Sequence, residues 1–344
     1  MKILLINVDS RWNLAIRRMY TYFTQQGHDV EMRDLCLSGY PHKRKVTIDA
    51  CGYDQVYVSN IFEHNAHRVT IEGCPEVIFG GVGSRDIDRK LPPEIEDCSP
   101  FYYPDEKTSY GFITRGCIRK CRFCKVLKHE GAIRMYNSLD SIIRDVPGER
   151  VDFLDNNILA HPLHMWVLDE LVERGTRCKF SQGLDFRLVN DENLDALSKL
   201  NYIGEYIFAF DDPEYQSLLD RKIEQIKRYI PKPWKLKFYL YYHPDMDLGQ
   251  LVDRVEWCRA HECLPYVMRD IACWESPIRD FLIDYAAYCN QAGMFKKMTF
   301  EQFMQRRKVG TERRRKSIET YKRYAHDAGG GNCYGGEWEK GGAE

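Results

Sequence analysis

The stretch YGFITRGCIRKCRFCKV, residues 110–126, joins an apolar run to three closely spaced cysteines. Its first six residues have the length and composition of a buried strand. Cys117, Cys121 and Cys124 follow in the pattern C-x3-C-x2-C, and Phe123 precedes the last of them. Three thiolates on one loop can hold three irons of a cubane cluster and leave the fourth iron open. A structural zinc site, in contrast, is normally closed by four ligands.

A series of strand-length runs continues from this stretch toward the C-terminus. The runs are YGFITR (110–115), VDFLD (151–155), KFSQGLD (179–185), YIFAFD (206–211), KLKFYLYY (235–242) and LPYVMRD (264–270). Helical segments are expected between them, at 138–146, 162–174, 191–200, 213–229 and 247–261. This alternation predicts a partial, right-handed (β/α)6 barrel over 109–275. The cysteines follow the first strand, at the barrel face where active sites lie.

Residues 1–90 show a similar alternation of strands and helices. Their apolar runs include KILLINV (2–8), YDQVYVSNIF (53–62) and PEVIFGG (75–81). We expect a Rossmann-like α/β domain with a parallel sheet covered on both faces. The proline-rich segment 91–108 has no apolar period, so it is expected to link this domain to the barrel.

The C-terminal part is predicted to be helical over 276–326, and some of these helices are basic. The segment 304–325 is rich in lysine and arginine. Such a segment is either a solvated helical face or a surface that contacts RNA phosphates. The glycine-rich, polar end, 327–344, is expected to be disordered.

Composition limits the class of protein. The chain has 344 residues with 50 basic and 51 acidic side chains, so no overall charge attracts nucleic acid or a membrane surface. The 13 cysteines are an odd number, and no secretory signal is visible, which argues against a disulfide framework. The apolar N-terminal run is too short for a signal peptide or a membrane span. We expect a soluble cytoplasmic protein that does not enter a membrane.

The cysteine motif, Phe123 and the strand series over about 109–270 resemble the radical S-adenosylmethionine superfamily. The resemblance implies a [4Fe–4S] cluster on Cys117, Cys121 and Cys124, with S-adenosylmethionine chelating the open iron. An external one-electron reductant of the flavodoxin or ferredoxin type would supply the electron. Reductive cleavage would then give a 5′-deoxyadenosyl radical that acts on a substrate the sequence does not identify, and methyl or methylthio transfer are further outcomes.

The same resemblance implies contacts to S-adenosylmethionine from residues near the strand ends. The candidates are Phe123, Asp155, Asn156, Gln182, Arg187 and Asp211. Asp155 and Asn156 would contact the methionine amino group, although the family's usual Gly-Gly-Glu is absent. Arg187 would bind the methionine carboxylate and Asp211 a ribose hydroxyl. Each of these polar residues can also be a loop cap or helix N-cap.

The N-terminal domain resembles the cobalamin-binding domain that precedes the barrel in one branch of the superfamily. The histidine ligand motif D-x-H-x-x-G is absent, so cobalamin is an option that no ligand motif supports. The glycine run at 80–83 either lets a ligand approach the backbone or forms the end of a sheet loop. Two other functions stay open. One is a tRNA-modifying methylthiotransferase-like enzyme, in which Cys36, Cys51 and Cys74 would serve a second cluster. The other is a structural zinc-binding interaction protein, with His129 a nearby fourth ligand.

Overall fold

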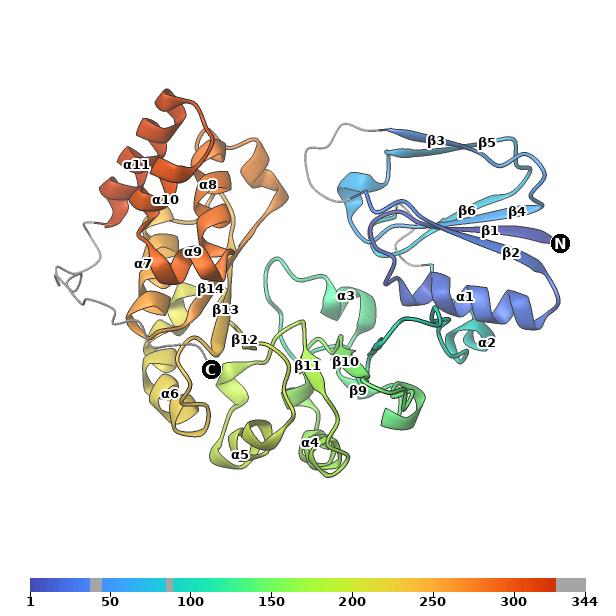
Figure 1. Ribbon diagram of the computed structural model, residues 1–344, viewed down its shortest axis with the longest axis horizontal. Coiled ribbons are helices and arrows are strands. Elements are labelled where there is room, and N and C mark those ends of the chain that lie inside the picture. The colour runs from blue at the N-terminus through green and yellow to red at the C-terminus, as the bar shows by residue number, and fades with distance from the viewer. Residues whose placement is uncertain (38–44, 85–88, 326–344) are drawn as a thin grey trace. The chain divides into compact units, whose positions relative to one another are not determined.

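The computed structural model describes residues 1–37, 45–84 and 89–325 (Figure 1). Backbone contacts divide the chain into two units. Unit 1 comprises Met1–Leu184 with Asp195–Ile203, and unit 2 comprises Asp185–Leu194 with Gly204–Glu344. The division falls after the third strand of the expected barrel series, and not at the expected linker, 91–108. The tail expected to be disordered lies outside the described residues.

Unit 1 begins with a four-stranded parallel sheet. Its strands are β1 (Lys2–Asn7), β2 (Asp29–Asp34), β4 (Gln55–Ser59) and β6 (Val77–Gly80), in the order β2-β1-β4-β6. Helix α1 (Leu14–Gln25) lies on one face of this sheet, and the parallel pair β3 (Val46–Asp49) and β5 (Val69–Glu72) lies on the other (Figure 1). Leu5 packs toward α1, whereas Leu4 packs toward Ile48 of β3. The first strand is continuously apolar because both its faces are buried.

The segment 91–108 packs against α1 in unit 1. It contains the short helix α2 (Pro93–Glu96). The buried Arg17 of α1 bonds to Glu106 at 2.9 Å and to the Phe101 carbonyl at 2.9 Å. The expected linker therefore packs within unit 1.

A second parallel sheet in unit 1 has the order β11-β10-β7, from strands β7 (Thr108–Gly111), β10 (Arg150–Phe153) and β11 (Cys178–Phe180). The short strands β8 (Thr114–Arg115) and β9 (Arg134–Met135) pair antiparallel. Helix α3 (Val126–Glu130) follows the cysteines, and α4 (His164–Glu173) and α5 (Asp191–Lys199) follow β10 and β11 along the chain.

The sheet of unit 2 is also parallel. Its strands are β12 (Tyr206–Ala209), β13 (Leu236–Tyr242) and β14 (Leu264–Arg269), in the order β12-β13-β14. The helices are α6 (Gln216–Tyr229), α7 (Leu248–Ala260), α8 (Arg279–Cys289), α9 (Ala292–Lys297), α10 (Phe300–Arg306) and α11 (Thr311–Ala325). The expected C-terminal helices are therefore present up to the last described residue.

The α/β class with parallel sheets is confirmed, whereas a single six-stranded barrel sheet is not seen in the described residues. The six strands form two three-stranded sheets. The free edge of β11 is taken by the segment 201–203: Cys178 accepts from Ile203 N at 2.8 Å and donates to the Asn201 carbonyl at 3.1 Å. This segment pairs where the next strand of a barrel would pair.

The prediction of a helix at 138–146 is wrong. The structure has only a short 3-10 turn at Leu139–Ser141. Asp145 then adopts φ +53°, and the backbone N–H of Arg144 and of Asp145 bond to the Glu149 carboxylate. Pro147 follows two residues later, and proline disfavours the helical conformation of the residue before it, Val146. Separately, no helix among the described residues has both the length and the apolar character that crossing a bilayer requires.

Candidate metal centre

The three cysteines lie on a tight loop between β8 and α3. Gly116 begins this loop with φ +87°, and a Cβ there would meet the Ala132 carbonyl oxygen at 2.3 Å. Cys117 N bonds to the Gly131 carbonyl at 3.2 Å, and Cys124 N bonds to the Cys121 carbonyl at 3.1 Å. The loop therefore folds back on the segment that follows α3, and glycine is required where the backbones meet.

The three cysteines are reduced, and backbone N–H groups contact two of their sulfurs. Cys117 and Cys121 are half-buried, Cys124 is exposed, and none forms a disulfide. Cys117 Sγ accepts from Arg119 N at 3.4 Å, and Cys124 Sγ accepts from Val126 N at 3.5 Å. N–H donors of this kind stabilise a thiolate, which is the metal-binding form of cysteine.

The donor set fits an iron–sulfur cluster in number and chemistry, because three cysteines lie within eight residues of the sequence and N–H donors contact two of their sulfurs. Among the described residues, the structure contains no group of three or more His, Cys, Asp or Glu side chains positioned to hold a metal ion. The fit accordingly rests on residue type, spacing and hydrogen bonding.

Asp155 is a buried carboxylate that fastens the strand leading into the loop. Its oxygens accept from Ile113 N at 3.1 Å, Thr114 N at 2.5 Å and Thr114 Oγ1 at 2.7 Å. Burial raises the pKa of Asp155 to about 6, although these hydrogen bonds act in the opposite direction. The side chain was expected to contact S-adenosylmethionine, and the structure occupies both its oxygens with protein donors.

Asn156 and Asn157 also reach the cysteine loop. Asn157 Nδ2 donates to Cys117 Sγ at 3.6 Å. Asn156 Nδ2 donates to Glu130 Oε2 at 2.7 Å, and the same oxygen accepts from Gly116 N at 2.9 Å. The end of β10 is thus connected to both ends of the loop.

Glu130 is a site residue that sequence reasoning missed. Besides Gly116 and Asn156, its carboxylate pairs with the Arg115 guanidinium at 2.9 Å. The residue lies at the end of α3, 14 positions after Gly116. No motif marks it, because its role comes from the loop folding back on itself.

The other expected cofactor contacts are more scattered. In unit 1, Phe123 is half-buried and Gln182 is exposed. In unit 2, the Arg187 guanidinium donates two hydrogen bonds to the Asp185 carboxylate, at 2.6 and 3.0 Å. Asp211, also in unit 2, accepts from Tyr241 N at 3.1 Å, and burial raises its pKa to about 6. The structure thus gathers Asp155 and Asn156 around the cysteine loop, and gives Arg187 and Asp211 partners within unit 2.

Glycines 81 and 83 of the N-terminal sheet serve its own packing. A Cβ on Gly81 would meet the Asn60 carbonyl oxygen at 2.3 Å, and one on Gly83 would meet the Phe62 carbonyl carbon at 2.5 Å. Asp9 holds the same neighbouring loop by accepting from Ile61 N at 2.5 Å. Close approach of the chain to itself accounts for these glycines, and cobalamin binding stays a prediction.

Comparisons with known proteins add no family to this picture. A scan against protein-family models finds no match to the chain, and a search of curated proteins finds no significant relative. The argument for function therefore rests on the residues and contacts described above.

Proposed function

We propose that this chain is a radical S-adenosylmethionine enzyme, in which Cys117, Cys121 and Cys124 bind three irons of a [4Fe–4S] cluster. The observation that carries the proposal is the loop itself: three cysteines without disulfides within eight residues, with N–H donors on the sulfurs of Cys117 and Cys124. When bound, the cluster and S-adenosylmethionine supply a 5′-deoxyadenosyl radical.

The chain's own residues have separate tasks in this proposal. The Arg119 and Val126 amides and the Asn157 side chain stabilise the thiolates. We assign Asp155 to positioning, because its oxygens hold the backbone of 113–114 just before the loop. Asn156 stays the candidate for the methionine amino group, and Gln182, Arg187 and Asp211 stay candidates for the rest of the cofactor.

The proposal includes an electron donor and a substrate outside the chain. The donor is a one-electron protein reductant of the flavodoxin or ferredoxin type. The exposed Cys124 places part of the loop in contact with solvent, which suits electron entry from a partner. Hydrogen abstraction, methyl transfer and methylthio transfer are alternative outcomes on the substrate, and a tRNA is one candidate for it.

Anaerobic reconstitution with iron and sulfide tests the proposal. We expect about four irons per chain and broad visible absorption, since a cubane cluster contains four irons. Reduction with dithionite in the presence of S-adenosylmethionine should then release 5′-deoxyadenosine. Each of Cys117→Ala, Cys121→Ala and Cys124→Ala should abolish this product. Cys98→Ala, a half-buried cysteine outside the loop, is the matched control. A loop variant that keeps full product formation contradicts the assignment.

A structural zinc site is the second candidate, and one observation favours it. The Nε2 atom of His129, on α3 just after the cysteines, is buried and has no hydrogen-bond partner within the described residues. Three thiolates and one imidazole make a closed zinc set. Metal analysis and the product assay on the same preparation distinguish the two candidates. The structural site is favoured if the chain binds one zinc, loses it in His129→Ala and releases no 5′-deoxyadenosine.

A further inference from the structure

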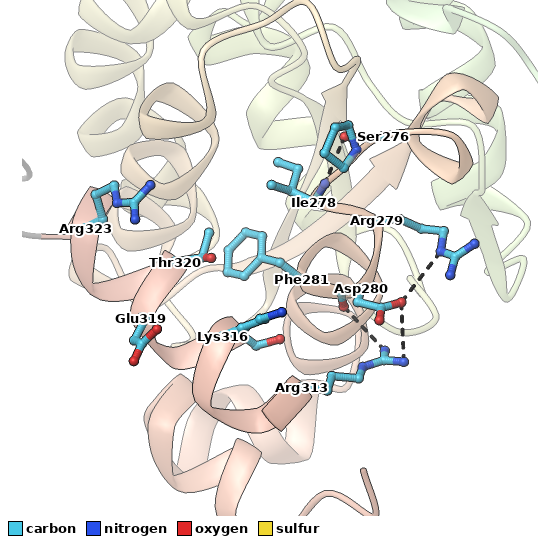
Figure 2. Close-up of a pocket in the computed structure, with 12 residues that line it drawn as sticks. Ser276, Ile278, Arg279, Asp280, Phe281, Arg313, Lys316, Glu319, Thr320 and Arg323 are labelled. Carbon is cyan, nitrogen blue, oxygen red and sulfur yellow. Dashed lines mark hydrogen bonds and ion pairs between the residues drawn. The ribbon is translucent and has the colours of Figure 1, made fainter. Parts of the chain in front are cut away.

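A solvent-open cavity lies between the start of α8 and helix α11 in unit 2 (Figure 2). Its volume is about 400 Å³, and it is lined by residues 276–281 and by one side of α11, from Arg313 to Arg323. This size falls at the lower end of the range for small-molecule sites, roughly 300–1,000 Å³. The cavity is separate from the cysteine loop, which belongs to unit 1.

Most cations of α11 outside this cavity are already engaged within the protein. Arg314 donates to the carbonyls of Met304 and Arg307, at 3.0 and 3.2 Å. Arg315 pairs with Glu312 and Glu319 on the same helix, at 2.9 and 2.7 Å. Although 304–325 is rich in basic residues, many of their side chains are therefore bonded within the protein and do not form a continuous positive surface.

The cations at the cavity are less committed. Arg279 has only a 3.6 Å contact to Asp280, and the exposed Lys316 has only a 3.3 Å contact to Glu312. Among the residues that the structure describes, the Arg323 side chain makes no ion pair or hydrogen bond. In the view of Figure 2, Lys316 lies between Arg323 and Thr320 on one side and Arg279 on the other.

Arg313 completes the lining and is held rigidly. Its guanidinium bonds to the buried Asp284 at 2.8 and 2.9 Å and lies 3.5 Å from Asp280. Counting the side chains that line the cavity, four cations face two carboxylates, Asp280 and Glu319, which leaves an excess of two positive charges. Guanidinium and ammonium groups are the side chains that best match the oxygens of a phosphate group.

We propose that this cavity binds a phosphate group, with Arg323, Lys316 and Arg279 as the ionic donors and the Thr320 hydroxyl as a neutral one. The dianionic charge of a phosphomonoester matches the excess of two positive charges. A phosphodiester of an RNA strand offers the same oxygens with one charge per group. The inference is independent of the iron–sulfur proposal, because it rests on residues of unit 2 alone.

Calorimetric titration of the full chain tests this site, using uridine 5′-monophosphate, uridine and a single-stranded oligouridylate without terminal phosphates. We expect the monophosphate or the oligonucleotide to bind and uridine not to bind. Arg323→Glu and Lys316→Glu should each weaken the affinity by about tenfold or more, because each reverses a charge at the ligand. Tighter binding of the oligonucleotide identifies RNA as the source of the phosphate, and binding of the monophosphate alone identifies a small phosphorylated molecule.

Lys322→Glu is the matched control, since the exposed Lys322 lies on the same helix, pairs with Glu301 at 3.4 Å and does not line the cavity. It should change the affinity by less than about twofold at moderate salt, where distant exposed charges are screened. Equal weakening by Lys322→Glu and Arg323→Glu would overturn the proposal in favour of a general field of the helix. Binding of uridine as tight as the monophosphate, or no binding of either phosphate probe, would overturn it as well.

Discussion

The side chains that follow β10 have roles that depend on contacts with residues far away in the sequence. Asp155 is predictable from sequence as a polar residue at a strand end. Its partners, Ile113 and Thr114, are 42 and 41 positions earlier, so no local spacing connects them. Glu130 is similar, because it acts on Gly116 and Asn156 only after the loop has folded. The cysteines need no such context, since their spacing lies within eight residues.

At this scale the pKa of Asp155 makes a testable prediction. Its folded value of about 6 lies above the usual 3.8, so its contribution to stability is complete below about pH 4 and is lost as the pH rises through 6. The loss is on the order of 3 kcal/mol at most, from about two pKa units. Asp155→Asn should remove this part of the pH dependence of the free energy of unfolding, measured by urea denaturation between pH 4 and 7. Asp169→Asn, exposed on α4, is the control, and an unchanged slope in Asp155→Asn contradicts the assignment.

Among the elements, α8, α10 and α11 are joined by one buried carboxylate. Asp284 of α8 is fully buried and bonds to Arg307 at 2.6 Å, to Arg313 at 2.8 Å and to the Ser317 hydroxyl at 3.0 Å. All three partners lie in the segment 304–325, whose basic composition is compatible with RNA contact. Some basic residues of this segment therefore stabilise the helix packing. The sequence alone does not distinguish them from the cations that line the cavity.

Removing this carboxylate should destabilise the three helices. Asp284→Ala leaves Arg307 and Arg313 without their buried partner, which we expect to lower the free energy of unfolding by about 3 kcal/mol. Urea unfolding followed by circular dichroism measures the change. Asp280→Ala, an exposed neighbour one turn earlier with only longer contacts, should cost less than about 1 kcal/mol. Equal effects of the two substitutions would show that Asp284 is not the central contact.

The whole molecule consists of two units, and the proposed centres divide between them. The cysteine loop and its supports Asp155, Asn156 and Glu130 belong to unit 1, whereas the cavity at α8 and α11 belongs to unit 2. Binding of a metal group at the loop should therefore have local consequences. We expect the effect to reach the residues that are hydrogen-bonded to the loop or to its flanking strand, namely 113–114, 131 and 156–157.

Metal removal tests this expectation by hydrogen exchange. Loading the chain with iron and sulfide should slow amide exchange at 113–132 and 155–157 by about tenfold or more relative to chelator-treated protein, because a ligand that binds only the folded loop suppresses its opening. Amides of α8 and α11 serve as the internal reference and should exchange equally in both samples. Slowing of similar size in both regions contradicts a local effect.

Local sequence patterns were enough to predict the α/β class, most strand and helix positions and the cysteine motif, because apolar periodicity and motif spacing lie within a few residues. They were wrong about the helix at 138–146, where Pro147 and the Glu149 carboxylate favour a turn. The division of the six strands into two sheets depends on the folded chain, since residues 201–203 pair with the edge of β11. The tertiary structure also decided which polar residues support the loop, because hydrogen bonds between residues far apart in sequence depend on the folded path of the chain.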